Sequence, residues 1–487
     1  MTTKKRIVTA ALSLLLCGTA LISCADNGNK NPAKETGGTR AEGTAAETAY
    51  TANVPKNLNY NDASFNICVY GENKVVWGDV DFSSTVENGD EINDGTLRRT
   101  RKVEEDLHIK INAIPGEGIC GQLESVRKSI ATQESAYDIA FLNIRAAGSG
   151  AQEGYLVDLK TVSDMELDAA WWDQHSITDL SIDNRLYMIT GDISVMYKKS
   201  IGVMLFNKDL ARDYNIGNPY EMVENKEWTI DRFISLCRMC HKDVNNDGKY
   251  TKDDLYGFLW YADIASLGII GGGSTFAEKD ENDLPTITFY NDRTVDILSK
   301  YLELFNDEQV SYDDNNEDVL KPMFMSGNAL FDFNEFHAVE QLRSMDTDFG
   351  ILPIPLYNET QEDYYHSINP HVGAVMVIPS DNLDLQKTAY VIDSLGAASK
   401  NILTPAYYEK YLKGKGTRDD ESQDIIDLVL RTVRYDMGYM YDWGGLSDLP
   451  LGLATKKSPN VSSEYNRIAK KANTAMNKMI SKIQKIS

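Results

Sequence analysis

The chain has 487 residues, of which 42% are hydrophobic, and its 73 acidic residues outnumber the 49 basic ones. This length is enough for two hydrophobic cores, because single cores stop growing near about 250–300 residues. The formal net charge of −24 argues against nucleic acid as a partner, and it also disfavours docking of the body on an anionic lipid surface.

The first residues have the pattern of a secretory signal. Lys4, Lys5 and Arg6 precede an apolar run at 7–20, which is shorter than the roughly 20 residues needed to span a bilayer. The tetrapeptide LISC that ends at Cys24 resembles the lipobox of bacterial lipoproteins. In such proteins cleavage leaves the cysteine first, and its sulfur carries a lipid with acyl chains such as palmitate. We therefore expect 1–23 to be a lipoprotein signal peptide and Cys24 to be the anchor; an ordinary secretory signal is the alternative.

The segment that follows is poor in apolar residues. Residues 26–56 are mainly Asn, Gly, Ala, Thr and Glu with one aromatic, which predicts a disordered segment rather than part of a core. We expect 24–57 to be a lipid anchor followed by a flexible tether that holds the body at the outer face of a cell membrane.

From residue 58 onward, strand and helix patterns alternate in two series. This alternation predicts βαβ units and mainly parallel sheets. In the first series we expect strands at 64–70, 108–114 and 137–142, and helices at 96–107 and 122–132. In the second we expect strands at 201–206, 255–261 and 329–333, a helix opened by Thr229, and a later strand at 373–378. Beyond Pro405 the pattern is mostly helical and ends in a charged amphipathic helix at 465–486.

Two motifs point to organic cofactors, but their surroundings argue against this. A G-x-G-x-x-G pattern at 116–121 follows a predicted strand, yet Pro115 and Glu117 crowd the place of a pyrophosphate. A C-x-x-C-H pattern at 237–241 lies within a predicted amphipathic helix, where Cys237 and Cys240 are better explained as small buried residues. We expect no organic cofactor.

Residues 243–254 match a calcium-binding loop. The predicted ligands lie at loop positions 1, 3, 5, 7, 9 and 12, where Gly248 provides the sharp turn at position 6. They are Asp243, Asn245, Asp247, the carbonyl of Lys249, Thr251 and Asp254. Aspartate at position 12 instead of glutamate resembles dockerin-type loops. We expect a structural calcium ion; the alternative is an acidic surface turn without metal.

Several stretches resemble one protein family in their order along the chain. They include GYLVDL at 154–159, LFNKDL at 205–210, WTIDRF at 228–233, FMSGNALF at 324–331 and FGILPIP at 349–355. Together they resemble the extracellular solute-binding proteins of ABC importers, in the large group that includes maltose-binding protein. Later stretches, TPAYYE at 404–409 and KGTRD at 415–419, look like a subgroup of lipoprotein members.

The resemblance implies an α/β fold of two lobes, each a mainly parallel sheet flanked by helices, with a ligand cleft at the hinge. We expect lobe 1 to comprise 58–192 and 373–402, and lobe 2 to comprise 193–372 and 403–487. The predicted crossovers between the lobes lie near 192–200, 366–373 and 401–404. The resemblance to solute-binding proteins also implies that the protein is a monomer and that it works with the permease subunits of an ABC importer.

The family mostly carries sugars, and the residue types at the predicted strand ends also suit a sugar. Pyranoses need flat apolar rings against their C–H faces and carboxylates or amides for their hydroxyls. The candidate ring residues are Trp77, Trp260, Tyr261 and Trp443, and the polar candidates are Asp90, Asn143, Arg145, Asp332 and Asn369. We assign Trp171 and Trp172 to packing.

These features predict a non-enzymatic, lipid-anchored receptor that captures a carbohydrate, such as an oligosaccharide, for an ABC importer. Three alternatives stay open: a lipoprotein that senses glycans without transport, a surface glycoside hydrolase, and a receptor for a non-sugar solute such as a peptide.

Overall fold

The structure is a computed structural model that describes residues 49–71, 77–117, 121–261, 263–314, 316–412 and 420–486. The predicted signal peptide, Cys24 and residues 24–48 of the predicted tether lie outside the described residues. Residues 49–487 belong to one compact unit. Buried apolar side chains from its two large sheets form a single continuous core.

Residues 49–57 differ from the predicted tether, because they lie against the folded body. The backbone N–H of Tyr50 donates to Asn401 Oδ1 at 2.9 Å, and Asn401 Nδ2 donates back to the Tyr50 carbonyl at 2.7 Å. The Asn53 N–H donates to Glu166 at 2.7 Å, and Val54 is half-buried against the core. These contacts place the start of the ordered body before residue 58.

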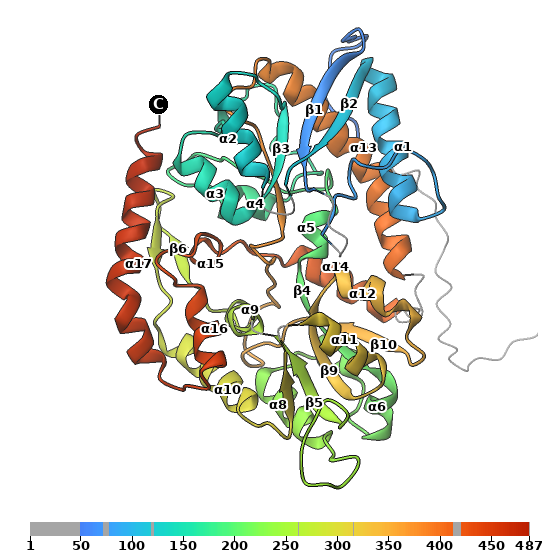
Figure 1. The fold of residues 1–487 in the computed structure, drawn as a ribbon, viewed down its shortest axis with the longest axis vertical. Helices are drawn as coiled ribbons and strands as arrows, with labels where there is room; N and C mark the ends of the chain where they lie inside the picture. The colour runs from blue at the N-terminus through green and yellow to red at the C-terminus, as the bar shows by residue number, and fades with distance from the viewer. Residues whose placement is uncertain are drawn as a thin grey trace, which may run out of the picture. The chain divides into compact units, whose positions relative to one another are not determined.

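The first sheet has four strands in the order β11-β3-β1-β2 (Figure 1). They are β1 (Ala63–Val69), β2 (Ile109–Pro115), β3 (Ile139–Asn143) and β11 (Ala374–Val377). The strands of the first predicted series are confirmed to within two residues at each end. Helices α1 (Glu91–Leu107), α2 (Gln122–Thr132), α3 (Ile144–Gln152) and α13 (Leu385–Leu412) pack around this sheet or against one another.

The second sheet has five strands in the order β10-β4-β9-β5-β8. They are β4 (Gly202–Asn207), β5 (Tyr256–Trp260), β8 (Ser311–Asp313), β9 (Ala329–Glu335) and β10 (Phe349–Leu352). Its helices are α6 (Lys208–Asp213), α7 (Pro219–Glu224), α8 (Ile230–Met239), α9 (Ile264–Gly271), α10 (Asp292–Phe305), α11 (Glu317–Met325), α12 (His337–Gln341) and α14 (Asp420–Arg431). As predicted, Thr229 opens α8, because its side chain accepts a hydrogen bond from the Arg232 N–H.

Each sheet is mainly parallel, as predicted, but one strand in each runs against the others. In the first sheet β1 pairs in parallel with β2 and β3, but β11 runs antiparallel to β3. In the second sheet β5 pairs in parallel with β8 and β9, but β4 is antiparallel to β9 and β10 is antiparallel to β4. The physical reason is the path of the chain. β4 and β11 follow crossovers and therefore start at the junction between the sheets, whereas β1, β3, β5 and β9 end there.

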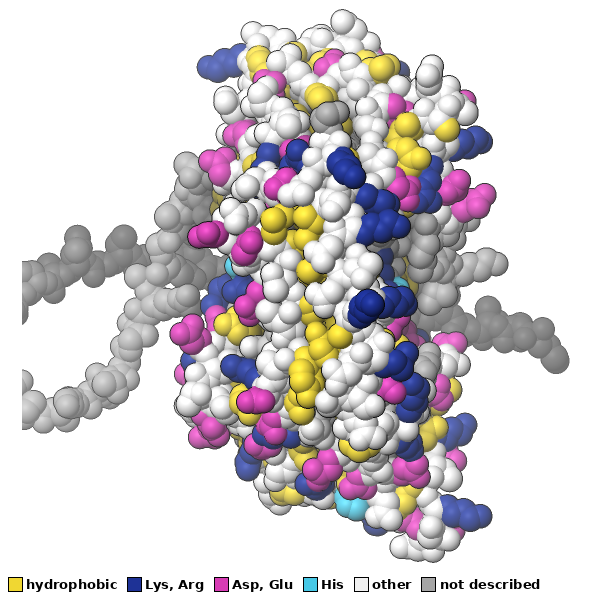
Figure 2. Space-filling view, turned by 90° about the vertical axis from the view of Figure 1, so that its left-hand side faces the viewer, with side chains coloured by type: hydrophobic (Ala, Val, Ile, Leu, Met, Phe, Trp, Pro, Cys, Tyr) yellow, Lys and Arg dark blue, Asp and Glu magenta, His cyan; other side chains and the backbone are white. Residues whose placement is uncertain are grey.

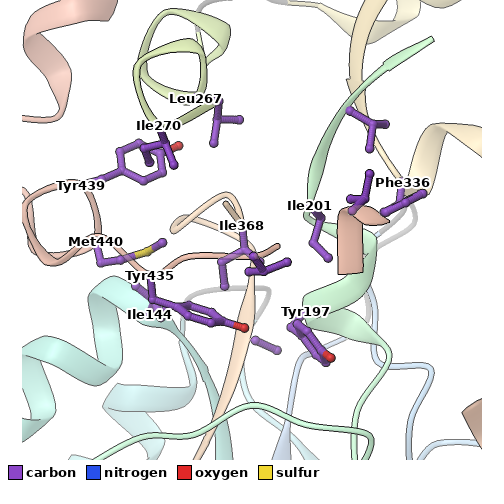
Figure 3. Packing of buried hydrophobic residues seen from close by; sticks show 14 of the residues in the cluster. Ile144, Tyr197, Ile201, Leu267, Ile270, Phe336, Ile368, Tyr435, Tyr439 and Met440 are labelled. Atoms are coloured by element: carbon purple, nitrogen blue, oxygen red, sulfur yellow. The ribbon is translucent and has the colours of Figure 1, made fainter. Parts of the chain in front are cut away.

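The crossovers predicted at 192–200 and 366–373 lie side by side between the two sheets. Ile201 pairs with Ile368 in an antiparallel bridge, and the Asn369 N–H donates to the Ser200 carbonyl at 2.8 Å. Figure 3 shows apolar side chains that meet around this pair, including Ile144 of α3, Leu267 of α9 and Tyr439. The junction between the halves is therefore packed as well as hydrogen-bonded.

The third crossover lies later than the predicted 401–404, a stretch that the structure places inside α13. That helix continues to Leu412 and packs along α1 over its length. The segment that lies beside the other crossovers is instead 432–434. Within it, Val433 forms a parallel bridge with His366. The predicted boundary between residues 402 and 403 thus falls within a helix of the first half.

The remaining described elements lie beside the junction or beyond α14. They are α4 (Gln174–Asp179), α5 (Met196–Lys199), the hairpin of β6 (Ala277–Lys279) and β7 (Pro285–Ile287), α15 (Met437–Tyr441), α16 (Asp448–Thr455) and α17 (Val461–Ile483), together with two short 3₁₀ turns. Helix α17 packs against α3 of the first half and against α10 and α16 of the second. Among the described helices, none is both long and apolar enough to cross a membrane.

A buried arginine ties the first crossover to the first half. Arg99 of α1 is fully buried and donates to the Ile193 carbonyl at 3.0 Å and to Ser399 Oγ at 3.0 Å. It also donates to the carbonyl of Asp81, whose carboxylate accepts from the Val195 N–H at 2.8 Å. Because an unpaired buried charge is costly, these partners hold the start of the crossover firmly.

Candidate functional site

The carboxyl ends of strands from both sheets face the same junction. In open α/β sheets ligands bind outside the carboxyl ends of the strands, where the connections diverge. β1 and β3 bring Trp77 and Arg145 to this junction, and β5 and β9 bring Tyr261, Asp263, Glu335 and His337. We call these six residues, together with Asn369 of the second crossover, the junction cluster.

An asparagine joins two carboxylates at the centre of the junction cluster. Asn369 Nδ2 donates to Asp263 Oδ2 and to Glu335 Oε1, both at 2.9 Å. The Tyr261 hydroxyl donates to the same oxygen of Glu335 at 3.2 Å. Burial raises the pKa of Asp263 to about 6, and the nearby charge of Glu335 adds to that effect while Arg145 opposes it. Acidic acceptors of this kind suit a ligand that offers hydroxyl or amine donors.

His337 makes the contact between the two halves at one side of the cluster. Its ring is buried, with Nε2 3.3 Å from Glu317 and Nδ1 3.4 Å from Glu335. Burial alone would lower the pKa of His337, but the two carboxylates outweigh it and raise the pKa to about 9. The ring of Trp77 from the first half meets His337 edge-on, with centroids 4.9 Å apart. A charged imidazolium therefore stands between the aromatic ring and Glu335.

Arg145 carries the positive charge on the side of the first half. Its Nη2 donates to Ser447 Oγ at 2.6 Å, and its guanidinium lies 3.7 Å from Asp442 and 3.9 Å from Asp448. Its side chain is 23% exposed, whereas that of Glu335 is 3% exposed. Arg145 is thus the more accessible charge of the cluster.

The structure brings some of the predicted ligand residues to the junction cluster and leaves the others outside it. The predicted residues that belong to the cluster are Trp77, Arg145, Tyr261 and Asn369. Asp332 lies beside it on β9, buried, with one carboxylate oxygen bonded to Asn334 and the other without a hydrogen-bond partner among the described residues. Burial raises the pKa of Asp332 to about 8, so that this carboxyl is mostly protonated at neutral pH.

Two polar candidates have local structural roles instead. Asn143 caps α3 by accepting from the Ala146 N–H at 2.9 Å. Asp90 caps α1 through the Ile92 and Asn93 amides and pairs with Lys410 at 2.9 Å. A short polar side chain just before a helix is more often a cap than a ligand residue, and the sequence already contained that signal.

Two of the predicted tryptophans pack against residues outside the cluster. The Trp260 ring is 3% exposed and stacks on Phe305 of α10 at 3.9 Å. The Trp443 ring is also 3% exposed, stacks on Tyr441 and donates from its indole N–H to the sulfur of Met479 on α17. Their rings are held by packing. Trp171 and Trp172 are buried as expected, and both indoles donate to Asp393.

Three members of the cluster were missing from the sequence analysis. Asp263 follows Tyr261 by two residues, and Glu335 and His337 follow Phe333, where the predicted strand ended. Their signal was the same as that of Tyr261, a polar side chain at the end of a buried strand.

Some cavities near the junction are lined by residues other than the predicted ligand residues. One of about 510 Å³ is lined by Ile270, Ser274, Tyr365 and Tyr435, together with neighbouring residues of β6 and α15. Another of about 460 Å³ is lined by Trp171, Asp192 and Lys198 and by residues of α13 and α14. Both have the size of small-molecule pockets, but none of the predicted ligand residues lines them.

The predicted calcium loop is an exposed loop in which carboxylates bind their own backbone. Asp243 accepts from the Gly248 N–H at 2.7 Å, and Asp254 accepts from the Val244 and Thr251 amides at 2.9 and 2.8 Å. Gly248 has φ +79°, as the turn at position 6 requires. Over the described residues, no group of three or more His, Cys, Asp or Glu side chains is arranged to hold a metal ion. Calcium binding by this loop stays a prediction.

Several solved structures match the fold of this chain. An ABC substrate-binding protein of Listeria monocytogenes in complex with cycloalternan matches with a TM-score of 0.54 at 12% identity, over 87% of this chain and 99% of that one. A cyclo/maltodextrin-binding protein complexed with maltotetraose matches with a TM-score of 0.55 at 14% identity, over 88% and 98% of the two chains. The chain has the two-lobe fold of ABC substrate-binding proteins.

A third solved structure extends the comparison to another kind of ligand. UgpB of Mycobacterium tuberculosis in complex with glycerophosphocholine matches with a TM-score of 0.57 at 14% identity, over 79% of this chain and 95% of that one. No family model matches the sequence, and no curated protein matches it. The substrate-binding-protein fold confirms the predicted two-lobe α/β architecture.

Proposed function

We propose that this chain is a non-enzymatic, extracytoplasmic receptor that captures a carbohydrate at the junction cluster and delivers it to an ABC importer. The observation that carries the proposal is the arrangement of Asn369, Asp263 and Glu335 at the carboxyl ends of strands between two sheets. Carboxylates accept hydrogen bonds from sugar hydroxyls, and Trp77 and Tyr261 offer rings for the apolar face of a pyranose. Two proteins with a similar fold have been solved in complex with cycloalternan and with maltotetraose.

Ligand entry requires the two halves to move apart. Glu335 and His337 are 2% and 1% exposed, so a ligand reaches them only when the Trp77–His337 contact opens. Hinge closure is the usual motion of two-lobe binding folds, and the paired crossovers are the segments that would bend. A closed form with ligand would replace the Asn369 bridge by bonds to sugar hydroxyls.

A lipid on Cys24 belongs to the same proposal, with the body held at the extracytoplasmic face of the cell membrane. Cys24 lies outside the described residues, so its support is the LISC motif after the apolar run. Each buried methylene contributes about 0.8 kcal/mol, so a diacyl anchor would hold the protein at the membrane. Mass spectrometry of the protein from membranes tests this, because a Cys24→Ser protein would lack the lipid mass.

The test of carbohydrate capture is a thermal-shift screen of the mature chain carrying Cys24→Ser against a panel of neutral oligosaccharides, followed by calorimetric titration. We expect at least one glycan to raise the melting temperature in a saturable way, with no hydrolysis of the glycan over hours. Hydrolysis would favour the glycoside hydrolase alternative. A normal response to glycans without uptake in cells would favour the sensing alternative.

A second candidate ligand class is a solute with a quaternary or protonated amine. It is favoured by the rings of Trp77 and Tyr261 next to Glu335, since aromatic faces attract cations. Glycerophosphocholine and short cationic peptides therefore belong in the same screen. A response to these alone would exclude a carbohydrate as the ligand.

A further inference from the structure

The last helix differs in charge from the rest of the chain. Between residues 467 and 485 there are six basic residues and no acidic one, although acidic residues outnumber basic ones over the whole chain by 73 to 49. All six side chains are exposed. We call this set the α17 basic face: Arg467, Lys470, Lys471, Lys478, Lys482 and Lys485.

The periodicity of α17 fixes which side faces outward. Its buried residues recur at intervals of three to four and form one stripe against the body: Ile468, Ala472, Met476, Met479 and Ile483. Lys471, Lys478 and Lys482 follow one another along one flank of this stripe, where their side chains are exposed. At 1.5 Å per residue, the helical part of the basic face, from Arg467 to Lys482, extends over about 22 Å. Figure 2 looks onto this side and shows Lys and Arg side chains in a row along the long helix.

Most of these basic side chains have no acidic partner in the part of the chain that the structure describes. Arg467 pairs with Glu464 at 2.8 Å, but Lys470, Lys471, Lys478 and Lys482 have no ion pair with any described carboxylate. Some exposed lysines elsewhere do have a partner, as Lys102 of α1 has in Asp106 at 2.8 Å. The positive field of α17 therefore projects into the solvent.

We propose that the α17 basic face is a docking surface for anionic phospholipid headgroups. Lysine-rich faces attract anionic lipid surfaces, and the attraction falls off within a Debye length of about 8 Å at physiological ionic strength. The acidic remainder of the protein is repelled by the same lipid surface, so the position of α17 determines which side of the protein faces the membrane. The membrane location is that of the proposed function, but the electrostatic contact does not depend on the ligand.

Lipid headgroups fit this face better than an acidic protein does. Five of the six residues are lysines, which are flexible, strongly hydrated point charges. Protein interfaces are depleted in lysine and enriched in arginine, whose fork matches fixed carboxylates. A row of separate, mobile charges matches a fluid array of headgroups.

The test measures binding of the mature chain with Cys24→Ser to large vesicles, so that no acyl chain contributes. The vesicles are equimolar phosphatidylglycerol and phosphatidylcholine, or phosphatidylcholine alone, in 100 mM or 500 mM NaCl. We expect sedimentation with the anionic vesicles at low salt, and release at high salt. The quadruple variant K470Q/K471Q/K478Q/K482Q is expected to reduce the partition coefficient at least ten-fold.

The matched control is K56Q/K110Q/K128Q/K252Q, which changes the net charge equally at four exposed positions away from α17. It should bind the anionic vesicles as the parent does. Equal loss in both variants, equal binding to the two vesicle types, or no binding by the parent would each overturn the proposal. If the parent does not bind vesicles but the α17 variant lowers uptake in cells, the occupant is an acidic protein face instead. Ligand affinity of the α17 variant is measured in parallel and should be unchanged.

Discussion

The two sides of the junction cluster differ in how completely they are built. The second half contributes Tyr261, Asp263, Glu335 and His337, which already hydrogen-bond or contact one another and Asn369. The first half contributes Trp77 and Arg145, and the polar partners of Arg145 (Ser447, Asp442 and Asp448) lie outside the cluster. The comparison suggests that the second half supplies most of the ligand's hydrogen bonds. The first half would supply a ring and a charge when the halves close.

The sharpest test of this difference is Glu335→Gln. The amide keeps the shape but loses the negative charge that faces His337 and would accept from ligand hydroxyls. Hydrogen bonds to charged groups contribute about 1.5–3 kcal/mol, so we expect ligand affinity to fall roughly 10- to 150-fold in calorimetric titration. Glu105→Gln on the exposed side of α1 is the control. Equal affinities of both variants would place the ligand elsewhere.

A smaller loss is expected from the first half. Trp77→Ala removes a half-buried ring at the entrance of the cluster, and we expect ligand affinity to fall by about 1–2 kcal/mol. Trp443→Ala is the matched control: its ring is buried against α17, so its loss should cost about 3–5 kcal/mol of folding free energy. Ligand affinity of the folded control should stay the same. A larger effect from Trp443 than from Trp77 would reverse our assignment of the two rings.

The pH dependence of stability tests the buried carboxyl of the second half. The pKa of Asp332 is raised to about 8 in the folded protein from its ordinary value of 3.8. Its stabilising contribution is therefore complete below about pH 4 and is lost as the pH rises through 8. Asparagine stays neutral, so the melting temperature of Asp332→Asn should gain on that of the parent between pH 4 and 8.

Asp346→Asn, at an exposed position, is the control for this pH series. Its difference from the parent should show no comparable trend. A flat difference for Asp332→Asn would mean that the carboxyl is ionised in the folded protein.

The smallest expected effect concerns the loop at 243–254, which belongs to the second half but contributes to neither side of the cluster. If the loop binds calcium near millimolar concentration, 10 mM calcium should raise the melting temperature by about 1–2 °C through mass action. Chelator should reverse the shift, and magnesium at the same concentration should not reproduce it. The double variant D243N/D247N should be insensitive to calcium. An unchanged melting temperature in the parent would show that the loop is only a turn.

The fold was predictable because its signals are local and repeated. Strands β3 and β4 are fully buried, mainly apolar runs, and Thr229 is a plain helix cap. The direction of β11 and β4 was not predictable, because it depends on where the chain re-enters each sheet. The continuity of α13 past residue 402 was also hidden, since Pro405 suggested a break.

The site was predictable only in part, for a similar reason. Tyr261, Arg145 and Asn369 lie directly after strands or in a crossover, where chain order alone brings them to the junction. Trp443 has the composition of a ligand-stacking residue, but α17 covers it from 36 residues away in the sequence. Glu335 and His337 were missed because β9 extends two residues beyond its predicted end.

The distribution of the six tryptophans has a practical consequence for spectroscopy. Five of them, at positions 171, 172, 228, 260 and 443, are at most 4% exposed, while Trp77 alone is half-buried. The intrinsic emission of the five should be constant and shielded from acrylamide. The fraction of the emission that acrylamide quenches then comes from Trp77, the indole beside His337. Quenching of the unlabelled protein can therefore be used to follow the opening and closing of the two halves.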